Sequence, residues 1–238
     1  MSKICKICFK VVFCILVLFV FNGVFNKVYA NVVSRILFNQ SLTTPEVKFD
    51  NDFVPKAFNA NNNLARNVGS YYFAKGDPLI LEGIVTDIND IPIEGVKVNI
   101  WHANYLGYYQ SSIQNEESDN FDINFRETGT SITDTLGRYM FLTIMPGNVK
   151  LDKSEYCPHI NFLITYNQVK KLQTKIFFKQ IKSDDCDNSK DFKILKLNSS
   201  QKQAIEQDLY YIDSRDQGLG KRVIFNIKIN QIQPTKEF

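Results

Sequence analysis

The chain has 238 residues, of which 44% are hydrophobic and 22% are charged, a composition that excludes an intrinsically disordered or fibrous protein. Its formal net charge of +3 comes from four lysines in the first thirty residues, where no acid lies, and the remainder carries 24 basic against 25 acidic side chains. We therefore expect no nucleic-acid partner, because the remainder has no excess of positive charge. The 208 residues after position 30 suffice for one domain with a full hydrophobic core.

Residues 1–30 have the pattern of a secretory signal peptide. Lysines precede an apolar run over residues 11–21, and Val28-Tyr29-Ala30 places small or apolar residues at positions −3 and −1 of a cleavage site. We expect cleavage after Ala30 and export to the periplasm or the medium. A retained anchor is the alternative, but eleven apolar residues fall short of the roughly 20 that a bilayer-spanning helix needs. No membrane span is expected after cleavage.

Two cysteines, Cys157 and Cys186, follow the signal peptide. In an oxidising compartment, such a pair favours one disulfide. The alternative is that Cys157 acts as a soft metal ligand beside His159, although a lone thiolate in such a compartment is more often bridged.

The rest of the chain divides into an arm and one domain. Residues 31–66 are rich in asparagine and weakly periodic, so we expect an extended N-terminal arm with few core contacts. Over residues 67–238, short β-type runs bounded by turn residues predict an antiparallel all-β sandwich. One short C-terminal helix is expected over residues 199–212, where Ser200 and Gln203 have capping-box spacing. The β-type runs are residues 79–87, 96–100, 138–143, 160–165, 174–178 and 223–229.

Two groups of motifs in this domain resemble a known family. The first group is shared by many prealbumin-like sandwiches and identifies a fold without an activity. It comprises residues 83–87, 91–100, 133–141 and 146–147. The second group is more specific and comprises Trp101-His102-Ala103-Asn104 with Gly107 and Tyr109, then Pro158-His159-Ile160 and residues 174–178. Together they resemble the intradiol ring-cleavage dioxygenases, most of all the protocatechuate 3,4-dioxygenase type, from about residue 61 to residue 178.

The resemblance implies a mononuclear non-haem Fe(III) centre held by two tyrosines and two histidines. Phenolate oxygen suits hard ferric iron, whose charge lowers the tyrosine pKa far below its usual value of about 10, and imidazole completes the set. A catechol-type diol chelates the iron in this family, and O2 opens its ring between the two hydroxyls. Tyr109 falls on the first tyrosine ligand and His159 on the first histidine, so both are candidate metal ligands and catalytic residues.

Four positions depart from the family pattern. Val149 stands where the second tyrosine ligand is expected, and Asn161 stands where the second histidine is expected. Valine has no donor atom, and an amide oxygen is a weak neutral ligand. Tyr156 replaces an arginine and Lys175 a glutamine, and both are candidates for the substrate pocket. Replacement donors must come from elsewhere, and the nearest by sequence are Tyr156, Tyr108, Cys157 or an acid in the C-terminal third.

Three functions therefore stay open. The first is an Fe(III)-dependent dioxygenase that acts on a catechol-type diol and O2. The second is a catalytically inactive exported β-sandwich, without a cofactor, that binds a small aromatic, a glycan or an envelope protein, and the third is a structural or adhesion module. In the last two, Tyr109 and His159 are core residues, as we expect Trp101 and His102 to be in any case. An oligomer is compatible with all three, although the regions through which family members often assemble are not preserved in this chain.

Overall fold

The computed structural model describes residues 43–47, 54–113, 115, 117–151, 154–179, 186, 188–212 and 220–230. The expected signal peptide and the first part of the expected arm, up to residue 42, lie outside the described residues. Within these ranges, no helix is both long and apolar enough to cross a membrane.

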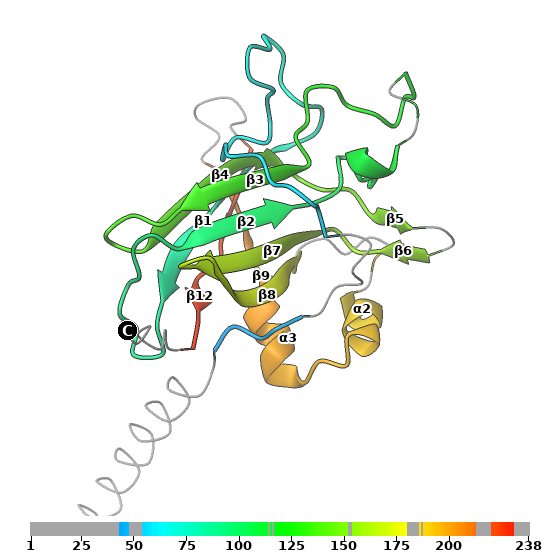
Figure 1. Ribbon diagram of the computed structural model, residues 1–238. Helices are drawn as coiled ribbons and strands as arrows, with labels where there is room; N and C mark the ends of the chain where they lie inside the picture. The colour runs from blue at the N-terminus through cyan, green and yellow to red at the C-terminus, as the bar shows by residue number, and fades with distance from the viewer. Residues whose placement is uncertain are drawn as a thin grey trace, which may run out of the picture. The chain divides into compact units, whose positions relative to one another are not determined.

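The strands of the described residues form two five-stranded sheets and a separate ribbon (Figure 1). Their bounds are β1 (Pro78–Thr86), β2 (Lys97–Trp101), β3 (Thr128–Ile132), β4 (Arg138–Ile144), β5 (Val149–Leu151), β6 (Ser154–Tyr156), β7 (His159–Tyr166), β8 (Val169–Phe178), β9 (Glu206–Gln207), β10 (Leu209–Tyr211), β11 (Lys221–Ile224) and β12 (Ile227–Lys228). In the first sheet, β1 pairs with β4, β11 and β12, and β10 pairs with β11. The second sheet has the order β3-β2-β7-β8-β9, and the ribbon joins β5 to β6.

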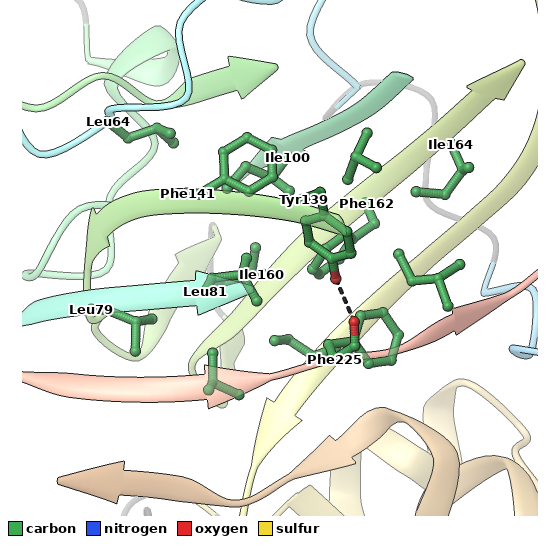
Figure 2. Packing of buried hydrophobic residues seen from close by; sticks show 14 of the residues in the cluster. Leu64, Leu79, Leu81, Ile100, Tyr139, Phe141, Ile160, Phe162, Ile164 and Phe225 are labelled. Carbon is green, nitrogen blue, oxygen red and sulfur yellow. Dashed lines mark hydrogen bonds between the residues drawn. The ribbon is translucent and has the colours of Figure 1, made fainter. Parts of the chain in front are cut away.

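The main core lies between the two sheets, because apolar residues alternate along their strands. In β1, Leu79 and Leu81 are fully buried and face residues of β7 such as Phe162. The Phe162 ring packs on Phe225, with ring centroids 5.0 Å apart. Figure 2 shows how the Tyr139 hydroxyl, buried in this core, donates to the carbonyl oxygen of Phe225 at 2.5 Å. The predicted all-β sandwich is confirmed.

The pairing of the last strands differs from the predicted, wholly antiparallel sheets. β1 runs parallel to β11 and β12, and β8 runs parallel to β9, so both sheets are mixed. Parallel neighbours need a long crossover connection, usually a helical one. The chain between β8 and β9 contains two helices, α2 (Asn188–Ile194) and α3 (Ser199–Ile205), which lie beside β8 and β9 (Figure 1). These helices make the parallel return to β8 feasible.

The helical prediction was correct in place but wrong in extent and number. α3 ends at Ile205, and the predicted helical residues after it form β9 and β10. Its capping box uses Asn198 and Gln201, whose side chains each accept a hydrogen bond from the other's backbone N–H at 2.9 Å. α2 was not predicted. Its Phe192 packs with Ile205 of α3 and Phe177 of β8 in a second, smaller core.

The segment before residue 67 contributes to the core, contrary to the expected few contacts. Leu64 and Ala65 are buried in the main core, and Val47 in the smaller one. The backbone of Leu64 donates to Leu142 at 2.7 Å and accepts from Arg126 at 2.9 Å. Gly129 makes room for its side chain, since a Cβ there would lie 2.4 Å from a Leu64 methyl carbon. A single apolar residue can thus fill a space in the core even when its segment has no apolar periodicity that would predict burial.

Candidate functional site

The two candidate metal ligands lie side by side at one end of the second sheet. His159 is the first residue of β7, and Tyr109 follows β2 in a loop. The hydroxyl oxygen of Tyr109 is 3.5 Å from Nε2 of His159, and each residue is 5% exposed. The fold therefore brings together two potential donors that are fifty positions apart in the sequence.

The loop that carries Tyr109 is held by residues of the same sequence motif. The Asn104 side-chain oxygen accepts from the backbone N–H groups of Leu106 at 3.0 Å and Tyr108 at 3.1 Å. Gly107 has a positive φ of 87°, and a Cβ at this position would lie 1.7 Å from the carbonyl oxygen of Asn148. The motif residues before Tyr109 therefore shape the turn and pack it against the segment that leads into β5.

Hydrogen bonds fix the orientation and the tautomer of His159. Its Nδ1 donates to the carbonyl oxygen of Cys157 at 2.8 Å, which leaves the lone pair on Nε2 directed toward Tyr109. The backbone N–H of Cys157 donates to the Asp191 carboxylate at 2.9 Å, and Cys157 forms a disulfide with Cys186. Burial, and then the charge of Lys175, hold the pKa of His159 well below its usual 6.5. The imidazole is therefore neutral at pH 7, as a metal ligand must be.

Asn161 lies two residues further along the same face of β7 and contacts Tyr109 directly. Its amide nitrogen donates to the Tyr109 hydroxyl at 2.9 Å and to the carbonyl oxygen of Trp101 at 3.2 Å. Its own amide oxygen is buried and has no hydrogen-bond partner among the described residues. Burial, opposed by this hydrogen bond and reinforced by the charge of Glu127, raises the pKa of Tyr109, so without a cation nearby the phenol is neutral.

Val149 stands at the position where the family resemblance led us to expect a second tyrosine ligand, and its side chain is a hydrocarbon. It is fully buried and packs with Trp101, Ala103 and Tyr109 in an apolar cluster, against which Tyr156 also packs. On the β5–β6 ribbon, Val149 lies directly opposite Tyr156. The side chain at position 149 therefore seals the site but offers it no donor.

A small cavity of about 40 Å³ adjoins His159. Lys175, which pairs with Asn161 across β7 and β8, lines it together with Tyr156. Asp191 of helix α2 and Leu195, the residue after that helix, also line the cavity. The structure thus places both sequence-predicted pocket residues on one cavity with His159. The cavity has room for a few water molecules and is far smaller than pockets for drug-sized ligands, which are roughly 300 Å³ or more.

Comparison with known proteins identifies the family. A protein-family model described as a dioxygenase matches residues 50–218 of the chain. A Rickettsia bellii protein with the provisional name of dioxygenase is 29% identical over 191 residues, which cover 74% of this chain and 84% of that protein. The chain belongs to the intradiol dioxygenase family.

Solved structures of this family share the fold. The intradiol ring-cleavage dioxygenase of Tetranychus urticae superimposes with a TM-score of 0.59 at 20% identity, over 82% of this chain and 98% of that one. Catechol 1,2-dioxygenase of Acinetobacter sp. ADP1 superimposes with a TM-score of 0.61 at 20% identity, over 88% of this chain and 69% of that one. At these identities the likeness concerns the fold, which is that of an intradiol dioxygenase.

The donors at this site fit a cation, but they are fewer than the four ligands expected from the family resemblance. Donors of one ion at bonds of about 2.0 Å lie roughly 3 to 3.5 Å apart, a spacing that Tyr109 and His159 match. The partnerless amide oxygen of Asn161 is a further, weak donor beside them. The described residues contain no group of three or more His, Cys, Asp and Glu side chains that could hold a metal. Any cation here would thus be held by Tyr109, by His159 and by ligands from outside this group of residues.

His102 does not belong to the site. It is fully buried, and its ring nitrogens lie 2.7 Å from the carbonyl oxygen of Ala103 and 2.7 Å from the Thr143 hydroxyl. Burial lowers its pKa to about 4. Both nitrogens are occupied, so His102 has the structural role that the sequence led us to expect.

Asp191 is a site residue that sequence reasoning did not name individually. It is 5% exposed and supports His159 through the backbone of Cys157. A signal for it existed in the cysteine pair, because a bridge from Cys157 to Cys186 must bring the residues after Cys186 close to His159.

Proposed function

We propose that this chain is an Fe(III)-dependent dioxygenase that opens the ring of a catechol-type diol between its two hydroxyls. Family membership supports the reaction class. The observation that carries the proposal is the buried pair of Tyr109 and His159, 3.5 Å apart, with the histidine held as a neutral imidazole whose lone pair faces the phenol. Buried groups with strongly shifted pKa values gather at functional sites, so we infer that this pair serves a function.

Tyr109 and His159 would hold the iron in this proposal. Ferric iron, when bound, supplies the charge that stabilises a chelated catecholate and prepares it for reaction with O2. Tyr109 must lose its phenolic proton to become a ligand, and burial opposes that loss. Iron affinity should therefore fall as the pH is lowered.

The cavity residues would orient the diol. The Lys175 ammonium lies close enough to His159 to lower its pKa, and it would attract the anionic oxygens of a catecholate. The chelating diol would supply two oxygen ligands at the positions that Val149 and Asn161 leave without strong donors. Because the cavity is only about 40 Å³, Tyr156 or Leu195 must move to admit an aromatic ring.

A second candidate is a catalytically inactive protein that uses this fold to bind a small aromatic, a glycan or an envelope protein. Two observations favour it. Val149 and Asn161 replace donors with a hydrocarbon and an amide, and the Tyr109 hydroxyl is already hydrogen-bonded by Asn161. In that case Tyr109, His159 and Asn161 form a closed polar network without a cation.

Iron content and the visible spectrum decide between the two. The full chain, incubated with ferrous ammonium sulfate under air and desalted, should retain one iron per chain and show a broad tyrosinate-to-Fe(III) band. Tyr109→Phe should lose both, whereas Tyr108→Phe should keep both. Catechol and protocatechuate should then be tested for O2 uptake. A folded, colourless and iron-free wild-type protein would exclude the enzyme and support the second candidate.

We also propose that the chain is exported and that residues 1–30 are removed. The signal-peptide pattern supports this, and so does the disulfide, since disulfides persist in oxidising compartments. The intact mass of protein recovered from the periplasm or medium should correspond to residues 31–238. Recovery of a species that retains residues 1–30 would contradict the proposal.

A further inference from the structure

We propose that Tyr156 is a second phenolate ligand of the metal held by Tyr109 and His159, an inference that rests on the proposed function. Tyr156 takes over a donor role that Val149 cannot fill, from the neighbouring strand of the same ribbon. Three observations support this: the register of the ribbon, the contacts of the Tyr156 ring, and the state of every other candidate donor around the cavity.

The strand register places Tyr156 on the same face of the β5–β6 ribbon as Val149. Val149 on β5 pairs directly with Tyr156 on β6. Side chains of directly opposed residues project from the same face of an antiparallel ribbon, with their Cβ atoms about 5 Å apart. Since Val149 projects into the cluster that contains Tyr109, Tyr156 projects toward it as well. The phenol is much longer than the valine side chain and reaches further along that direction.

The contacts of Tyr156 join the two candidate ligands. The ring packs against the buried cluster of Trp101, Ala103, Tyr109 and Val149. It also lines the cavity beside His159. Tyr156 thus contacts the cluster that contains Tyr109 and shares a cavity with His159. None of the described residues forms a hydrogen bond with its hydroxyl, so that oxygen is available to a cation.

The other groups near His159 are less suited to this role. Cys157 is bound in the disulfide and has no thiolate to offer. The Asp191 carboxylate already accepts the backbone N–H of Cys157. Lys175 is a cation, and the Asn161 amide is neutral. Tyr156 is a cavity group that can supply a hard anionic oxygen, which ferric iron prefers, and its ring also packs against the cluster that contains Tyr109.

The coordination step balances in charge and protons. The phenolic O–H bond of Tyr156 breaks, its proton leaves to water, and the oxygen binds the metal. With Tyr109, two phenolates then offset two of the three positive charges of the ion, where a single phenolate would leave two unbalanced. Binding of ferric iron should therefore release two phenolic protons from the protein rather than one.

Matched phenylalanine variants of the full chain test the inference. Tyr156→Phe keeps the ring packing and removes only the oxygen. Tyr210→Phe, on an exposed tyrosine of β10 in the other sheet, is the control, and Tyr108→Phe tests the other candidate tyrosine. With ferric iron as the probe, wild type, Tyr210→Phe and Tyr108→Phe should release two protons per iron. Tyr156→Phe should release one, show a weaker tyrosinate band, and lose iron to a competing chelator with an affinity loss beyond the roughly 10 to 100-fold of an indirect effect.

The outcomes separate this inference from the proposed function. If wild type binds iron with a tyrosinate band, and Tyr156→Phe matches it in proton release, band intensity and affinity, then Tyr156 is not a ligand while the proposed function stands. If Tyr108→Phe shows the losses instead, the second ligand is Tyr108. If wild type binds no iron, both the inference and the proposed function fail. Circular dichroism of each variant would verify that it is folded.

Discussion

The two faces of strand β7 are both buried, but by different kinds of side chain. On one face, Ile160, Phe162 and Ile164 are fully buried against the first sheet. On the other face, His159 and Asn161 are only 5% and 3% exposed. The apolar face is covered by a second sheet of the same fold. The polar face is covered by irregular pieces: the Tyr109 loop, the β5–β6 ribbon and helix α2.

The two faces differ in how specific their side chains must be. Apolar burial gains free energy roughly in proportion to area and tolerates similar side chains. A buried polar group loses free energy unless each of its atoms finds a partner. The polar face therefore depends on a few specific hydrogen bonds, to the Cys157 carbonyl, the Trp101 carbonyl and the Tyr109 hydroxyl. We expect it to contribute less to the free energy of folding than the apolar face does.

The largest expected effect on stability comes from the apolar face. Phe162→Ala should lower the free energy of unfolding by about 3 to 5 kcal/mol, because it opens a cavity between the sheets. Leu163→Ala, at the next and partly buried residue on the polar face, is the control and should cost less. Urea unfolding followed by fluorescence measures both. Equal losses in the two variants would contradict the distinction between the faces.

The disulfide beside the polar face should contribute almost as much to the free energy of unfolding as the Phe162 side chain does. Replacing both Cys157 and Cys186 by serine should lower the free energy of unfolding by roughly 3 to 4 kcal/mol, since the bridge closes a loop of 29 residues. It should also weaken iron binding, because Cys157 orients His159. A reductant should destabilise wild type and leave the double variant unchanged. No difference between oxidised and reduced wild type would show that the bridge does not form in solution.

Acid should weaken the fold through its two buried histidines. In the unfolded chain both take up protons near pH 6.5, whereas in the folded protein burial lowers the pKa of His102 to about 4 and that of His159 well below 6.5. Because the unfolded state binds more protons in this range, stability falls as the pH is lowered from 6.5 toward 4. The expected slope is about 1.4 kcal/mol per pH unit for each histidine.

His159, which lies on the polar face of β7, is one of the two buried histidines and should account for about half of this pH dependence. In the iron-free protein, His159→Gln should remove about half of the slope, measured by urea unfolding between pH 7 and pH 5. A slope that stays the same in the variant would show that His159 titrates normally in the folded protein and is not held neutral by burial.

The smallest expected effect concerns the charge beside the polar face. Lys175→Gln removes a cation that lowers the pKa of His159, so that pKa should rise while remaining below its usual value, because burial is the larger cause. NMR titration of the iron-free protein measures the shift. Lys170→Gln, on the same strand but at the far end of β8, is the control. A shift of equal size in the control would show that Lys175 has no special position.

The sandwich strands could be predicted because their signal is local. Alternating apolar residues in β1, β4 and β7 predict strands with one face in a core, and the structure has them at nearly the expected positions. The sequence predicted a strand over residues 223–229, where β11 and β12 lie, but it predicted neither the parallel pairing of these strands with β1 nor the strand β9. The parallel pairing of β9 with β8 depends on the crossover through α2 and α3.

The features of the candidate site also divide into those that local sequence motifs predict and those that they do not. The motifs around Tyr109 and His159 identify the family without coordinates. They also predict that Val149 and Asn161 stand where two of its metal ligands are expected. The sequence also named Tyr156 and Lys175 as pocket candidates. It did not predict the role of Asp191, the hydrogen bond from Asn161 to Tyr109, or the pairing of Tyr156 with Val149.

The fold class, the family and the polar or apolar character of each face of β7 can be read from the sequence, because residue type and short-range spacing suffice for those. The contacts between distant groups needed the folded chain: Leu64 in the space beside Gly129, Asp191 behind His159, and Tyr156 across from Val149. The physical reason is that these contacts depend on the register and the crossover of segments far apart in the chain, and local patterns carry no information on either.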